Sequence, residues 1–156
     1  MSFFANDNTE GTDSARLWEG NCQPREYGSD VLAFVGDGVF GLMVREYLAL
    51  NSRVHAGEQH NRAVAMVRCE AQADYMQRLL PHLTEEEEGV FRRGRNYHTS
   101  HTPRKNVAAY RTATGLEALF GYLYLCGNTP RLRELFEICI VPDNENSKDN
   151  ETNQTT

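Results

Sequence analysis

The sequence has no run of apolar residues approaching the roughly 20 that a membrane-spanning helix needs. It also has no CxxC pair among its four cysteines, Cys22, Cys69, Cys126 and Cys139. The first absence predicts a soluble protein with no membrane partner. The second, together with the lack of an apolar leader, predicts reduced thiols in an intracellular compartment. We expect a cytoplasmic protein, with an organellar matrix or stroma as the alternative if the chain is a mature form.

Acidic residues are missing from one long segment, between Glu88 and Glu117, although the whole chain carries a net charge of −6. Residues 1–30 carry −4 and residues 141–156 carry −3, so the remaining 110 residues carry +1. The glycine, asparagine and proline residues of the acid-free segment predict a loop, and phosphate is the expected partner of its cations. A solvated charged face is the alternative. The cations are Arg92, Arg93, Arg95, Arg104, Lys105 and Arg111.

Strand-like alternation and internal repeats are absent as well, and helical spacing takes their place. Phe40, Val44 and Leu48 belong to one amphipathic stripe, and residues 63–80 are rich in good helix formers. Thr84 followed by Glu87 is a capping box that opens a further helix at the TEEEE run. Residues 107–126 and the segment after residue 130 predict two more helices. The fold class is therefore all-α.

The two ends of the chain are polar and have no hydrophobic period. We expect residues 1–28 to be a flexible acidic segment and residues 142–156 to be a disordered acidic tail. The folded domain is predicted to span residues 29–141. A chain of 156 residues that is 40% hydrophobic can bury a sufficient core in one such domain.

Two acidic residues stand on helical stripes that are otherwise apolar. They are Asp37, in the stretch FVGDGVF, and Glu117. Each is followed four positions later by a glycine, Gly41 or Gly121, which allows another helix to approach closely. A turn is the alternative for the GDG stretch taken alone. Facing carboxylates suit Mg²⁺, and an acidic site beside a basic loop suits phosphodiester hydrolysis.

The remaining candidate ligands form weaker patterns. His98 and His101 make an HxxH pair in the basic segment, but no second spaced pair completes a tetrahedral zinc site. The four glutamates at residues 85–88 are explained by helix capping. Asp30 lies two turns before Asp37 and is predicted to cap a helix, with a more distant acid of the same site as the alternative.

Three stretches resemble the ribonuclease III family. LAFVGDGVFGL at residues 32–42 resembles its signature helix, while RRGRN at 92–96 and YRTATGLEALFGYLYLCGN at 110–128 resemble the Mini-ribonuclease III branch, whose members consist of the catalytic domain alone. The resemblance covers roughly residues 30–140. It implies an all-helical endonuclease bundle that forms a homodimer and cuts double-stranded or structured RNA. The implied products carry 5′-phosphate and 3′-hydroxyl ends with short 3′ overhangs.

The resemblance also implies roles for particular residues. Asp37 and Glu117 match the catalytic, metal-binding acids, with Mg²⁺ as cofactor and Mn²⁺ as a substitute. The classical enzymes carry two further acids where this chain has Ala33 and Thr114. Thr114 is expected to orient a coordinated water. The expected RNA-binding residues are Arg92, Arg93, Arg95, Asn96, Arg104, Lys105, Asn106 and Arg111.

The expected substrate is a 23S-type ribosomal RNA precursor, with a ribosomal protein as a candidate partner. The sixteen residues after Ile140 are too few for a double-stranded RNA-binding domain, so the catalytic surface itself is expected to hold RNA. Two other functions stay open. One is a non-catalytic RNA-binding or dimerisation module with a degraded site, and the other is an all-α nucleotide pyrophosphatase.

Overall fold

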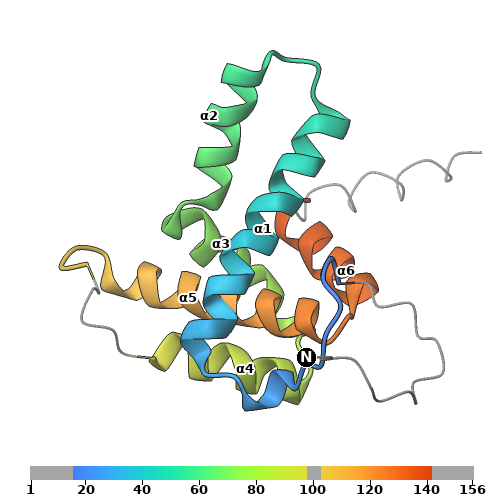
Figure 1. Cartoon of the computed structure of the whole chain (residues 1–156). Coiled ribbons are helices and arrows are strands. Elements are labelled where there is room, and N and C mark those ends of the chain that lie inside the picture. Colours follow the sequence, from blue (N-terminus) through green and yellow to red (C-terminus); the bar gives the residue numbers. More distant parts are fainter. Residues whose placement is uncertain (1–15, 98–102, 142–156) are drawn as a thin grey trace, which may run out of the picture.

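The computed structural model describes residues 16–97 and 103–141. Within these residues the fold is helical throughout, without a β-strand, which confirms the all-α prediction (Figure 1). None of the described helices is long and apolar enough to cross a membrane. The elements are η1 (Pro24–Glu26), α1 (Ser29–Asn51), α2 (Ala56–Val67), α3 (Cys69–Leu79), η2 (Leu80–His82), α4 (Glu85–Asn96), α5 (Val107–Leu125) and α6 (Thr129–Ile140).

Helix α5 is the centre of the bundle. It packs against α1, α3, α4 and α6, while the second half of α1 and all of α2 extend away from the body (Figure 1). The core side chains Leu116, Leu119 and Phe120 of α5 are fully buried. Phe40 of α1 meets Phe120 edge to face, with 5.2 Å between the ring centroids, and Phe136 of α6 at 5.7 Å. These aromatic contacts tie α1, α5 and α6 into one core.

Two glycines let α1 and α5 touch backbone to backbone. A Cβ atom added to Gly36 would overlap the carbonyl oxygen of Glu117, and one added to Gly121 would overlap the carbonyl oxygen of Leu32. The predicted close approach is therefore present, and Gly121 takes part in it as expected. On α1, however, the contacting glycine is Gly36. A Cβ on Gly41 would meet only the Nη1 atom of Arg45, at 3.0 Å. The GDG stretch lies inside α1 and is not a turn.

The helix expected over residues 63–80 is interrupted at Arg68, whose ψ of 154° is extended. Arg68 ends α2 and caps α3, and its carbonyl accepts a hydrogen bond from the backbone N–H of Gln72 at 3.0 Å. Helix α2 buries only Ala63, whereas α3 buries Gln72, Met76 and Leu79. The break turns α3 toward α5, so packing overrides a helix propensity that continues through the break.

The glutamate run opens α4 as predicted. Thr84 and Glu87 form both hydrogen bonds of the capping box. Glu87 is buried and pairs with Arg131 of α6 at 2.8 Å, which holds the pKa of Glu87 below its usual range. Glu86 accepts a hydrogen bond from the Tyr122 hydroxyl at 2.6 Å and pairs with Arg25. These acids therefore join α4 to its neighbours.

The segment before α1 was expected to be flexible up to residue 28. Its described part, residues 16–28, contains η1 and contacts the body through the Arg25–Glu86 pair and through Leu17, whose N–H donates to the Tyr124 hydroxyl at 2.8 Å. The expectations for residues 1–15 and 142–156 lie outside the described residues. Asp30 does not cap α1. It lies in the first turn, and Gly28 occupies the cap position without a side-chain bond.

The glycine contact generates a stability prediction. Gly36→Ala is expected to lower the free energy of unfolding by about 3 kcal/mol or more, because the added methyl group meets helix backbone that cannot move aside. Gly89→Ala in α4 is the control, since its methyl group would meet only the end of the Arg93 side chain at 3.4 Å. This control should raise stability by up to about 1 kcal/mol through helix propensity. Urea unfolding followed by circular dichroism measures both, and equal effects would contradict the contact.

Candidate active site

The crossing of α1 and α5 brings the two predicted acids to one place. Gly36 lies against the backbone of Glu117, so Asp37, the next residue of α1, is held beside Glu117. The charge of Asp37 acts on the Glu117 carboxyl. The glycine contact thus brings Asp37 and Glu117, which are 80 positions apart in the chain, to one site.

The two carboxylates differ in burial. Glu117 is half-buried, whereas Asp37 is exposed. The expectation that Asp37 lies on the inner face of its helix is therefore wrong for its side chain. Gly36 faces α5 at the crossing, and Asp37 projects beside the contact instead of into it.

Burial raises the pKa of Glu117 to about 7, and repulsion from Asp37 adds to the increase. Gln72 of α3 acts in the opposite direction and lowers this pKa. A cation between the two acids would offset both the burial and the repulsion, because it favours the charged form of each carboxyl. The electrostatics of the pair therefore fit a bound metal ion.

The two carboxylates of Asp37 and Glu117 fit a metal ion that keeps most of its coordinated water molecules. Among residues 16–97 and 103–141, no group of three or more His, Cys, Asp or Glu side chains forms a metal-ligand cluster. Two carboxylate ligands, with water in the other positions, is a common arrangement for Mg²⁺. A zinc site built from the described histidines and cysteines does not fit. His98 and His101 lie outside the described residues.

Thr114 lies one helical turn before Glu117 on α5 and is half-buried. Its hydroxyl donates a hydrogen bond to the carbonyl oxygen of Tyr110 at 3.0 Å. The threonine oxygen can therefore still accept a hydrogen bond from a water but has no proton left to donate. Ala33, at the other position where the classical family has an acid, is buried and has no donor atom.

The predicted basic loop is largely helical, and that prediction is corrected. RRGRN at residues 92–96 forms the last turns of α4, because Gly94 packs against α5, where an added Cβ would meet Ala118 at 2.7 Å. Arg93, Arg95 and Asn96 are exposed there. A hollow of about 520 Å³ lies over this end of α4 and is lined by Gly89, Arg92, Arg93, Asn96 and Tyr97.

The other expected RNA-binding residues divide into two groups. Arg104 and Lys105 are exposed just before α5. Arg92 pairs with Glu88 at 2.6 Å, and Arg111 is half-buried. Asn106 has a φ of 55° at the start of α5, and its amide donates to Glu70 at 2.9 Å. Asn106 thus has a structural role that sequence reasoning missed.

Sequence reasoning also missed Gln72, which is 1% exposed and faces Glu117 from α3. Its spacing to Met76 and Leu79, at four and seven residues, placed it on the inner face of a helix and could have identified it. Gly36 was missed for a different reason. Only the crossing shows which glycine of α1 meets α5.

Comparisons with known proteins show the family of the chain. A family model for the ribonuclease III domain matches residues 30–128. The Mini-ribonuclease 3 of Synechocystis sp. (strain ATCC 27184 / PCC 6803 / Kazusa) is 42% identical over 138 residues, covering 84% of this chain and 94% of that protein. The Mini-ribonuclease 3 of Enterococcus faecalis (strain ATCC 700802 / V583) is 44% identical over 113 residues, covering 70% of this chain and 85% of that protein.

A solved structure supports the same assignment. The crystal structure of a Fusobacterium nucleatum protein is similar to this one with a TM-score of 0.67 and 29% sequence identity, covering 74% of this chain and 93% of that chain. Residues 30–128, which the family model matches, contain both acids and the glycines that join their helices. The chain belongs to the ribonuclease III family and, within it, to the Mini-ribonuclease III branch.

Proposed function

We propose that this protein is a Mg²⁺-dependent endoribonuclease that hydrolyses phosphodiester bonds of double-stranded or structured RNA, leaving 5′-phosphate and 3′-hydroxyl ends. The observation that carries the proposal is the meeting of Asp37 and Glu117 at the α1–α5 crossing. The names of the relatives support a ribonuclease. A 23S-type ribosomal RNA precursor as substrate and a ribosomal protein as partner remain predictions that rest on the resemblance.

Each residue has a defined part in this reaction. Asp37 and Glu117 would hold the ion, and a bound ion would supply an activated water and stabilise the leaving oxygen. Asp37, being exposed, is the acid that RNA can approach. Glu117, being half-buried, is held by its surroundings. The Thr114 oxygen, whose proton is donated to Tyr110, would accept a hydrogen bond from a water and so orient it.

The exposed cations at the end of α4 and before α5 are proposed to hold the RNA backbone. Arg93, Arg95, Arg104 and Lys105 are exposed and can reach phosphates, and Asn96 adds an amide donor. Such contacts bind every sequence with similar strength and weaken steeply as salt rises. Recognition would then depend on the shape of the RNA more than on its bases.

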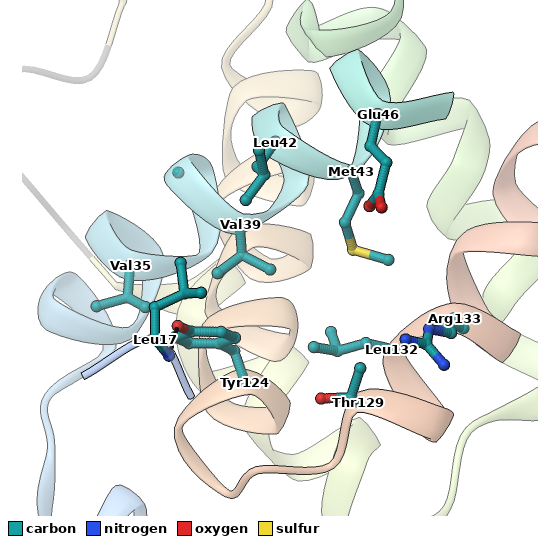
Figure 2. Close-up of a pocket in the computed structure, with 11 residues that line it drawn as sticks. Leu17, Val35, Val39, Leu42, Met43, Glu46, Tyr124, Thr129, Leu132 and Arg133 are labelled. Carbon is teal, nitrogen blue, oxygen red and sulfur yellow. Dashed lines mark hydrogen bonds between the residues drawn. The ribbon is translucent and has the colours of Figure 1, made fainter. Parts of the chain in front are cut away.

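We further propose that the active form is a homodimer joined through the outer face of α1. Val31, Phe34 and Leu42 are exposed on this helix, and Phe34 is 80% exposed. The same face borders an apolar groove of about 370 Å³ between α1, the end of α5 and the start of α6. Figure 2 shows Val35, Val39, Leu42 and Met43 along one side of the groove, with Tyr124, Thr129 and Leu132 opposite and Leu17 at one end.

This surface suits a two-fold symmetric dimer, because the surface carries both the projecting Phe34 side chain and the apolar groove. In a symmetric dimer the same patch serves both subunits, so Phe34 of one subunit can enter the groove of the other. A second copy of the chain would cover apolar area that is otherwise exposed to water.

The experiment that tests the proposed function is cleavage of a long, fully paired RNA with and without Mg²⁺. Asp37→Asn and Glu117→Gln are each expected to lower the cleavage rate by more than about 100-fold, because each removes a ligand of the ion that activates water. RNA binding should persist. Asp74→Asn, which alters an exposed acid of α3, is the control and should cleave normally.

The products also distinguish the alternatives. Staggered 3′ ends that require Mg²⁺ support the endoribonuclease. RNA binding without cleavage by the wild type, over several metals and salt concentrations, would instead identify a non-catalytic RNA-binding module. The nucleotide pyrophosphatase has less support, because such a site needs more acids than the described residues bring together.

The raised pKa of Glu117 predicts a pH dependence of stability. The group has a pKa near 4.5 when unfolded and about 7 when folded, so the folded state binds more protons between these values. Without divalent metal, the melting temperature of the wild type should fall as pH rises from about 4.5 through about 7. The groups facing Glu117 are Asp37, Gln72 and Cys69, and burial raises the pKa of the Cys69 thiol, which keeps it neutral here.

Thermal unfolding of wild type and Glu117→Gln in EDTA measures this effect. The variant should lose most of the decline over this pH range, and Mg²⁺ should raise the melting temperature of the wild type more at pH 8 than at pH 5. Parallel pH curves for the two proteins would contradict the assigned pKa.

The dimer is tested by Phe34→Asp. The variant is expected to be a folded monomer by size-exclusion chromatography with light scattering, because the exposed side chain contributes little to the core of one subunit. Leu50→Asp changes a residue of α1 that is equally exposed, at 79%, but lies in the last turn of the helix, in the half that extends away from the body (Figure 1), so it should leave a dimer intact. A dimer that persists in Phe34→Asp would rule out this face.

A further inference from the structure

Gln72 is a buried amide whose hydrogen-bonding capacity is unused. Its side chain is 1% exposed, and neither Nε2 nor Oε1 completes a hydrogen bond within the described part of the chain. Buried polar side chains in folded proteins nearly always have a partner, and leaving one without a partner is destabilising. An apolar residue of the same size would fit this position with less loss of stability.

The surroundings of Gln72 fix where the amide points. Its backbone is anchored in the first turn of α3 by the hydrogen bond to Arg68, and Met76 and Leu79 on the same stripe are fully buried. The side chain faces the carboxyl of Glu117 and interacts with it, although neither amide atom completes a hydrogen bond of good geometry there. The amide therefore meets the acid on its protein side, while Asp37 lies at its exposed side.

We propose that Gln72 is a positioning residue for Glu117: its Nε2 donates a hydrogen bond to one carboxylate oxygen, which leaves the other oxygen for the metal, and its Oε1 accepts a hydrogen bond from a water of the ion's hydration shell. The inference rests on the proposed metal-dependent function. It explains why a destabilising amide occupies a core position of α3, since a ligand held by an outer partner binds its metal more tightly.

A purely structural role makes a different prediction. If the amide only filled space, an apolar residue of similar size would leave metal binding unchanged. The matched variants are Gln72→Met, which keeps the length of the side chain and removes both polar atoms, and Gln77→Met, which makes the same change at an exposed position of the same helix.

The first measurement is Mn²⁺ affinity by isothermal titration calorimetry, with the melting temperature recorded alongside. Gln72→Met is expected to bind Mn²⁺ about 10- to 100-fold more weakly than the wild type, with a melting temperature that is equal or higher. Gln77→Met should match the wild type in affinity. Unchanged affinity in Gln72→Met would overturn the inference, whatever its melting temperature.

The second measurement uses the wild type and does not depend on any variant folding. The side-chain amide signals of Gln72 in a ¹H–¹⁵N spectrum should shift as Mg²⁺ is added, while those of Gln77 stay in place. Gln72 signals that do not move while the protein binds Mg²⁺ would also overturn the inference.

Glu117→Gln separates this inference from the proposed function. If the wild type binds Mn²⁺ and Glu117→Gln does not, the metal site stands, and the Gln72 variant then decides the positioning role alone. If the wild type does not bind Mn²⁺ or Mg²⁺, the metal site and the role of Gln72 fail together.

Discussion

The contact between Gly36 and Gly121 is the constraint on which the rest of the structure depends. Without Cβ atoms, α1 and α5 touch through their backbones, and each helix brings one acid to the crossing. A methyl group at either glycine would push the helices apart and move Asp37 away from Glu117. Helices α3 and α4 pack against other faces of α5. The geometry of the site is thus fixed by main chain, which is stiffer than any side-chain contact.

The electrostatics of the site follow from unequal burial. Glu117 is held in a setting that disfavours its charge, and Asp37 adds repulsion from the exposed side. Two ionised carboxylates in this arrangement destabilise the folded state, because one is partly buried and the two repel each other. A cation between them would offset both effects. Gln72 supplies the opposing influence from within the core. We regard this arrangement as a compromise in which some folding stability is given up for the proposed metal site.

Helix α1 has three roles, which explains why it is apolar around most of its circumference. Phe40 and Val44 face the core, and Asp37 stands at the site. Phe34 and Leu42 are exposed beside the groove where a second subunit is proposed to bind. A helix with two apolar faces is typical of an element buried on both sides, so the proposed dimer would complete the burial that one subunit leaves unfinished.

The sequence by itself determined the helical class, the capping box of α4 and the pair Asp37 and Glu117, because hydrophobic period and cap chemistry act over a few neighbouring residues. Only the tertiary structure decided the rest. The break at Arg68, the helical form of RRGRN, the choice of Gly36 over Gly41 and the place of Gln72 all depend on contacts between segments far apart in the chain. Local preference is weak at these positions, so packing against α5 determines the outcome.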